Sequence, residues 1–240
     1  MKHFKLDPEF PSLLFKSGLK STLVFLEDLL KDYSKRTLTK DTDRAVALSG
    51  LAARIAGALS CKEHYGIFSF YLHRNLLWQR SDLQSMMERI ESKSRDVPSW
   101  SWMAYTGGIE FMNVDFGELD LFKNLGFDKK DNQALITDVW EFQDCHLKET
   151  EKAESEVARR EILDSYKTKR GWLMYNVKGK EDFLSERGVV VGRTGSEDQS
   201  EYLMLIVKQR GENKSEYKRV GIGMVQKGYI SRQKADVRVF

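Results

Sequence analysis

The chain has 240 residues, of which 39 are basic and 36 are acidic, so its formal net charge at pH 7 is only +3. Hydrophobic residues make up 41% and charged residues 31%, which is typical of a folded globular protein and excludes a disordered chain. Because the charges nearly balance, composition gives no electrostatic reason to expect a nucleic acid or a membrane surface as partner.

The sequence predicts a cytoplasmic protein without a membrane-spanning segment. The first ten residues lack the apolar core of a signal peptide, and no apolar run approaches the ~20 residues that a spanning helix needs. Two cysteines, Cys61 and Cys145, are too few for a disulfide framework, and we expect both to be reduced. None of these features distinguishes the cytoplasm from the nucleus.

An amphipathic helix is predicted over residues 19–33, after an irregular segment at residues 1–18. Three leucines recur at helical spacing on one side of this helix: Leu23, Leu26 and Leu30. Another helix is predicted over residues 69–78, within a dense aromatic stretch.

A helix with small residues on its surface is predicted to follow a cap at Asp41 or Thr42. One apolar side of it is formed by Ala45, Leu48, Ala52, Ile55 and Leu59. Gly50 and Gly57 each cost ~1 kcal/mol relative to alanine inside a helix, but with the neighbouring alanines they permit close approach of another helix. We therefore expect this helix to be packed on more than one side. The N-terminal helices are predicted to bind a protein partner or a second copy of the chain.

A hairpin is predicted where the helical part of the sequence ends. Its first strand is Pro98-Ser99-Trp100-Ser101-Trp102, its turn is Gly107-Gly108, and its return strand is Ile109-Glu110-Phe111. Alternation places both tryptophans on one side of the strand and both serines on the other. The tryptophan side is expected to be buried.

Short apolar runs bounded by turn residues predict further strands over residues 134–142, 171–177, 188–193, 202–208, 218–225 and 237–240. The fold class is therefore α+β, with N-terminal helices over residues 1–97 followed by an antiparallel β-rich barrel or sandwich over residues 98–240. Within the second part, residues 147–170 carry many charges of both signs and few large apolar groups. They are predicted to form a solvated helix or a mobile insertion.

No motif in the sequence indicates a catalytic site, a metal or a cofactor, and none is predicted. Cys61-x-x-His64 has the spacing of half a zinc site, but Cys145-His146 supplies adjacent ligands that point apart. Gly221-Ile222-Gly223 resembles the start of a dinucleotide fingerprint, yet no helix follows it. We interpret these glycines as a bulge or a close approach between backbones.

Several short segments follow one another in the order of a known family: Tyr33-Ser34-Lys35-Arg36-Thr37-Leu38-Thr39, Asp43-Arg44-Ala45, Ala47-Leu48-Ser49-Gly50-Leu51-Ala52, Tyr65-Gly66, Leu76-Leu77-Trp78, Pro98-Ser99-Trp100-Ser101-Trp102 with Gly108-Ile109, and Tyr217-Lys218-Arg219-Val220-Gly221. Together they resemble the stretch downstream of the core in fungal heterokaryon-incompatibility (HET) domain proteins. Gly66-Ile67-Phe68 departs from the family's Gly-Leu-Trp, and the N-terminal HET core is not found. The resemblance implies a downstream region whose helices would pack on that core, with a role in fungal non-self recognition and programmed cell death.

Three functional hypotheses remain open at this point. The first is a non-catalytic regulatory or interaction region of a HET-type protein. The second is an enzyme with an aromatic-lined pocket, for which the candidate residues are Trp78, Trp100, Trp102, Asp43, Arg44 and Arg219. The third is a nucleic-acid-binding β-barrel that uses basic and aromatic residues such as Tyr217-Lys218-Arg219. The balanced charge makes this third hypothesis the weakest of them.

Overall fold

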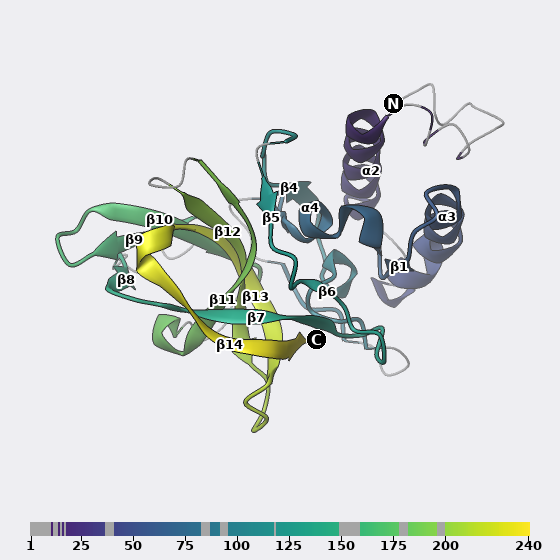
Figure 1. The fold of residues 1–240 in the computed structure, drawn as a ribbon. Coiled ribbons are helices and arrows are strands. Elements are labelled where there is room, and N and C mark those ends of the chain that lie inside the picture. The colour runs from purple at the N-terminus through teal and green to yellow at the C-terminus, as the bar shows by residue number, and fades with distance from the viewer. Residues whose placement is uncertain are drawn as a thin grey trace.

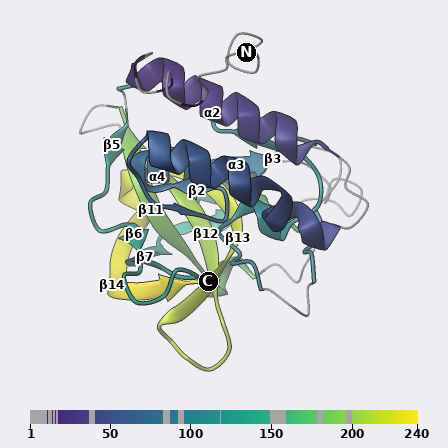
Figure 2. The same cartoon turned by 90° about the vertical axis from the view of Figure 1, so that its right-hand side faces the viewer.

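The computed structural model describes residues 11, 14, 16, 18–36, 41–82, 87–91, 96–117, 119–148, 159–177, 182–195 and 200–240. The fold is α+β, as predicted: two N-terminal helices precede a large and mostly antiparallel ten-stranded sheet that curls into a nearly closed ring (Figure 1). The helices are α2 (Leu19–Ser34), α3 (Arg44–Ala58) and the short α4 (Leu72–Leu76). Helices α2 and α3 lie on the same side of the sheet (Figure 2).

The ring consists of strands β11, β7, β14, β13 and β12, and the pairing of β12 with β13 closes it. These strands are β7 (Leu135–Phe142), β11 (Glu186–Thr194), β12 (Glu201–Gln209), β13 (Glu216–Gln226) and β14 (Ile230–Val239). Strands β10 (Lys169–Tyr175), β9 (Arg160–Asp164) and β8 (Cys145–Leu147) extend the sheet beyond β13. All described pairings are antiparallel except the short parallel contact of β13 with β14.

Short strands connect the helical part to the sheet. They are β1 (Glu63–His64), β2 (Ile67–Phe68), β3 (Trp78–Arg80), β4 (Ile109–Phe111), β5 (Asp120–Leu121) and β6 (Gly126–Phe127). Strand β3 pairs with β4, while β5 and β6 add to β11 and β7.

Both faces of the central strands are buried, which explains their nearly continuous apolar sequences. In β12, Leu203, Leu205 and Val207 belong to the apolar cluster that also contains the inner sides of α2 and α3. The alternate residues Tyr202, Met204 and Ile206 belong to a second cluster on the other face of the sheet. The first cluster continues from the helices through Trp78 and Trp100 to the strands, so one core crosses residue 98.

The predicted tryptophan hairpin is wrong. Residues 99–100 form a turn, and residues Trp102–Ala104 form a 3-10 helix. Strand β4 pairs with β3 instead of with the tryptophan segment. The segment is buried on both sides, since the two serines are buried as well as the two tryptophans (Ser99, Trp100, Ser101 and Trp102). Ser101 can be buried because its hydroxyl donates to the carbonyl of Tyr65 and accepts the N–H of Met103.

The predicted charged insertion at residues 147–170 is also wrong for its described part, which forms β9, a turn and the start of β10. The charges pair across neighbouring strands: Glu161 contacts Lys148 at 3.2 Å and Lys169 at 3.1 Å. Asp164 closes the turn by accepting the N–H groups of Tyr166 and Thr168. The charged residues of this segment pair on the surface of a hairpin. Their high number in the sequence led to the prediction of a solvated insertion. Residues 149–158 lie outside the described part of the chain.

The close backbone approach predicted at Gly221-Ile222-Gly223 is confirmed. A Cβ atom on Gly221 would collide with the main-chain oxygen of Met174, and one on Gly223 would lie 2.8 Å from the main-chain oxygen of Trp172. Both glycines pair with β10 and keep β10 and β13 in close contact.

We expect Gly221→Ala to lower the free energy of unfolding by about 1–3 kcal/mol, because the added methyl group must push two paired strands apart. Urea unfolding followed by circular dichroism measures this change. The matched control is Gly50→Ala on α3, where a Cβ meets open space. That control should stabilise the chain by about 0.5–1 kcal/mol. An unchanged stability of Gly221→Ala would contradict the assigned role of this glycine.

Candidate functional site

Arg219 and Trp78 form the centre of the candidate site. The guanidinium carbon of Arg219 lies 3.7 Å from the centroid of the Trp78 ring. Nη1 of Arg219 donates to the carbonyl of Leu76 at 2.8 Å, and its Nη2 donates to the carbonyl of Trp78. Both side chains are buried. These two of the six predicted pocket residues are in direct side-chain contact. They lie far apart in the sequence, and no motif links them.

Arg44 and Trp102 form a second pair of predicted residues, with the guanidinium carbon 5.3 Å from the ring centroid. Arg44 donates to the carbonyls of Ser34, Tyr105 and Gly107, and it is itself buried. Of the remaining predicted residues, Trp100 is joined to the first pair, and Asp43 is separate from both. Trp100 accepts a hydrogen bond from Trp78 Nε1 on its carbonyl, and Asp43 is exposed at the start of α3. The three tryptophans have no exposed surface and fill the core.

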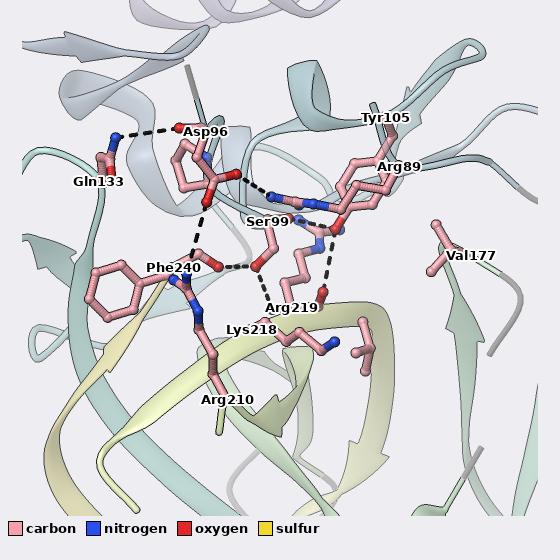
Figure 3. A pocket seen from close by; sticks show the side chains of 12 residues that line it. Arg89, Asp96, Ser99, Tyr105, Gln133, Val177, Arg210, Lys218, Arg219 and Phe240 are labelled. Atoms are coloured by element: carbon pink, nitrogen blue, oxygen red, sulfur yellow. Dashed lines mark hydrogen bonds and ion pairs between the residues drawn. The ribbon is translucent and has the colours of Figure 1, made fainter. Parts of the chain in front are cut away.

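A cavity of about 260 Å³ lies between residues 96–105 and strand β13. Arg219 is the one predicted residue among those that line it. The other polar side chains around the cavity are Arg89, Asp96, Ser99, Tyr105, Gln133, Arg210 and Lys218 (Figure 3). Of these, the sequence indicates only Lys218, as part of the basic segment Tyr217-Lys218-Arg219, and sequence reasoning missed the others as pocket residues. In a strand, the alternation of Tyr217, Lys218 and Arg219 indicates one exposed cation between two buried side chains.

The two hydroxyl groups of the cavity are held by main-chain partners. Ser99 Oγ accepts the N–H of Arg219 at 2.7 Å and donates to the carbonyl of Phe240. Tyr105 Oη lies 3.1 Å from the carbonyl of Ser99 and 3.4 Å from that of Arg219 (Figure 3). Burial raises the pKa of Tyr105. Neither hydroxyl contacts a side chain that could remove its proton, so this arrangement suits binding better than nucleophilic chemistry.

The cavity is positively charged. Burial lowers the pKa of Arg219 to about 9, which still leaves its guanidinium charged at neutral pH. Among the described residues, no acidic side chain forms an ion pair with Arg219 or with Lys218. Asp96 is the single acidic side chain among the described residues at the cavity, and its two oxygens lie 3.1 Å from Arg89 Nη2 and 3.9 Å from Arg210 Nη2.

Both cysteines and His64 lack the environment of reactive groups. Burial raises the pKa of the Cys61 thiol, and burial beside Asp144 raises the pKa of Cys145 to about 11, so both thiols are poor nucleophiles at neutral pH. Burial lowers the pKa of His64, whose ring packs edge-on against Phe127. In the described segments, no group of three or more histidine, cysteine or acidic side chains could hold a metal ion.

The outward side of α3 is an exposed helix surface with a single charged side chain, that of Arg54. It is formed by Val46, Ala47, Ser49, Gly50, Ala53, Arg54 and Gly57. Val46 is 59% exposed, and a Cβ atom on either glycine would meet nothing within 4 Å. Within the described residues α3 is thus packed on one side only, and the prediction that it packs on more than one side is wrong for this part of the chain.

Comparison of the chain with protein-family models, curated proteins and solved structures gave no match. The resemblance to HET-type proteins therefore rests on the sequence motifs alone. No helix in the described ranges is both long and apolar enough to cross a membrane.

We expect Arg219→Lys to lower the free energy of unfolding by about 1–3 kcal/mol, because an ammonium group cannot stack on Trp78 while donating to both carbonyls. Urea unfolding at neutral pH measures the loss. The neighbouring exposed cation provides the control: Lys218→Gln should change stability by less than about 0.5 kcal/mol. Equal effects of the two substitutions would show that the buried guanidinium is not a structural centre.

Proposed function

We propose that this chain is a non-catalytic regulatory or interaction region of a HET-type protein, and that a protein partner docks on the outward side of α3. The observation that carries the proposal is the composition of this side. From Val46 to Gly57 its exposed residues include a single charged side chain, that of Arg54. Solvated helix surfaces in globular proteins usually carry charged residues, so this side has the composition of a contact surface.

Helix α2 provides the comparison within the same chain. Its outward side exposes Leu19 and Val24, but it also carries Lys20, Asp28, Lys31 and Asp32, and Lys31 pairs with Asp28 at 2.9 Å. This is the pattern of a helix that remains in water. The two helices lie on the same side of the sheet (Figure 2). Their position on the sheet therefore does not explain why the outward side of α3 carries fewer charged residues than that of α2.

The HET core is the occupant that the sequence resemblance implies. Its expected position is next to the N-terminal helices, and the small residues Gly50, Ala53 and Gly57 permit close packing of another backbone on α3. The process would then be the fungal non-self response that ends in programmed cell death. This link to the process depends on the family resemblance.

Two further observations support binding over the alternatives. The candidate hydroxyl and thiol groups lack activating partners among the described residues, which weakens the hypothesis of an enzyme. Tyr217 and Arg219 are buried, so they are not available to stack on the bases of a nucleic acid.

We expect the double variant V46E/A53E to lose binding to a purified HET core domain, because it places two carboxylates in the centre of the docking surface. Glutamate is a good helix former, so the variant should keep the fold. Titration calorimetry with wild type and variant measures the difference, which should exceed about tenfold in Kd if both positions are desolvated in the complex.

The control variant is Leu184→Glu, which changes an 84% exposed apolar residue outside α3 in the same way. It should bind the core as the wild type does. Sedimentation velocity over a range of concentrations tests the other occupant, a second copy of the chain. Two results would refute the HET core as the occupant. One is that the wild type self-associates and V46E/A53E does not, and the other is that V46E/A53E still binds the core.

A further inference from the structure

The cavity at Arg219 carries more positive charge than its own acidic side chain can neutralise. Among the described residues, four cationic side chains line it (Arg89, Arg210, Lys218 and Arg219), against the one carboxylate of Asp96. The cavity is also lined by the apolar residues Pro98, Val177, Val220 and Phe240. Such a low-dielectric wall strengthens the electrostatic field of the cations inside the cavity.

The buried guanidinium of Arg219 adds a charge that lacks a counterion. It is 2% exposed, and its guanidinium contacts the carbonyls of Leu76 and Trp78 and the ring of Trp78. Its Nε atom is buried and has no hydrogen-bond partner among the described residues. An anion in the adjacent cavity would supply the missing negative charge at short range.

Asp96 shows how an anionic group fits this place. Its carboxylate lies between two guanidinium groups, with one oxygen 3.1 Å from Arg89 and the other 3.9 Å from Arg210 (Figure 3). The longer distance leaves Arg210 incompletely paired. Its guanidinium stacks at 5.1 Å from the Phe240 ring centroid, and that of Arg89 lies 5.7 Å from the Tyr105 centroid, so aromatic rings hold both cations beside the cavity.

We propose that this cavity binds the phosphate group of a small phosphorylated molecule, which displaces the Asp96 carboxylate from Arg89 and Arg210. A phosphate offers enough acceptor oxygens for Arg89, Arg210 and Lys218 together, whereas one carboxylate has only two oxygens. The volume of about 260 Å³ favours a small metabolite, since pockets that bind drug-sized ligands measure about 300–1,000 Å³. This proposal is independent of the docking surface on α3.

Titration of the full chain with inorganic phosphate at fixed ionic strength tests the proposal. Backbone amide signals are followed by NMR. Saturable shifts should be confined to residues 89, 96, 97, 99, 105, 210 and 218–220. Citrate, a polycarboxylate, is titrated in parallel, and O-phosphoserine tests a phosphate group on a small organic molecule. Non-saturable shifts, shifts spread over the whole surface, or binding of citrate without phosphate would overturn the proposal.

Two variants with opposite expected effects locate the site. Arg210→Gln combined with Lys218→Gln should weaken phosphate binding at least about tenfold, because two charge-assisted hydrogen bonds are lost. Asp96→Asn should strengthen it by about three- to tenfold, because the competing carboxylate is removed. The fold of each variant is checked by its unfolding temperature without phosphate.

The matched controls remove the same charges elsewhere on the surface. Lys227→Gln and Glu212→Gln change exposed residues that do not line the cavity, and both should leave the affinity for phosphate unchanged. If Glu212→Gln raised the affinity for phosphate as much as Asp96→Asn does, the effect would be one of overall charge, and the site would be rejected. Unchanged binding by the double variant would also reject it.

Discussion

The hydrogen bonds of a buried guanidinium to helix-end carbonyls are the constraint on which the arrangement of helices and sheet depends. Leu76 is the last residue of α4, and its carbonyl has no partner within that helix. Arg219, from β13, donates to this carbonyl and to that of Trp78 in β3. One side chain from the ring of strands thus satisfies the end of a helix and the start of a strand more than 140 residues earlier in the chain.

Arg44 uses the same interaction on the other side of the helical part. Ser34 is the last residue of α2, and its carbonyl accepts a hydrogen bond from Arg44, which also donates to Tyr105 and Gly107. Both arginines bind main-chain carbonyls, and both stack on a tryptophan. Guanidinium suits this role because its planar donors reach several carbonyls at once while its face packs on an indole ring. Arg44 and Arg219, two of the six pocket residues proposed from the sequence, are therefore primarily structural.

Periodicity predicted those parts of the fold in which local sequence and burial agree. The leucines of α2 and the apolar runs of β7, β11, β12 and β13 gave the correct element types and an α+β fold. It failed where polar residues are buried or charged residues form strands. Ser99 and Ser101 are inside the protein because distant main-chain groups satisfy their hydroxyls, and Glu161 tolerates a strand because Lys148 and Lys169 pair with it. Such partners lie too far along the chain for a local pattern to reveal them.

The same limit applies to the candidate site. Tyr217-Lys218-Arg219 indicated a basic segment, but its meaning depends on Arg89, Asp96 and Tyr105 from another part of the chain. Tyr105 contacts both structural arginines, since its carbonyl accepts from Arg44 and its hydroxyl lies 3.4 Å from the carbonyl of Arg219. The buried start of α3 and the cavity are therefore connected through Arg44 and Tyr105. Energetic coupling between two sites requires an element with two alternative arrangements. Main-chain hydrogen bonds fix each step of this connection, so a partner on α3 and an anion in the cavity would bind independently.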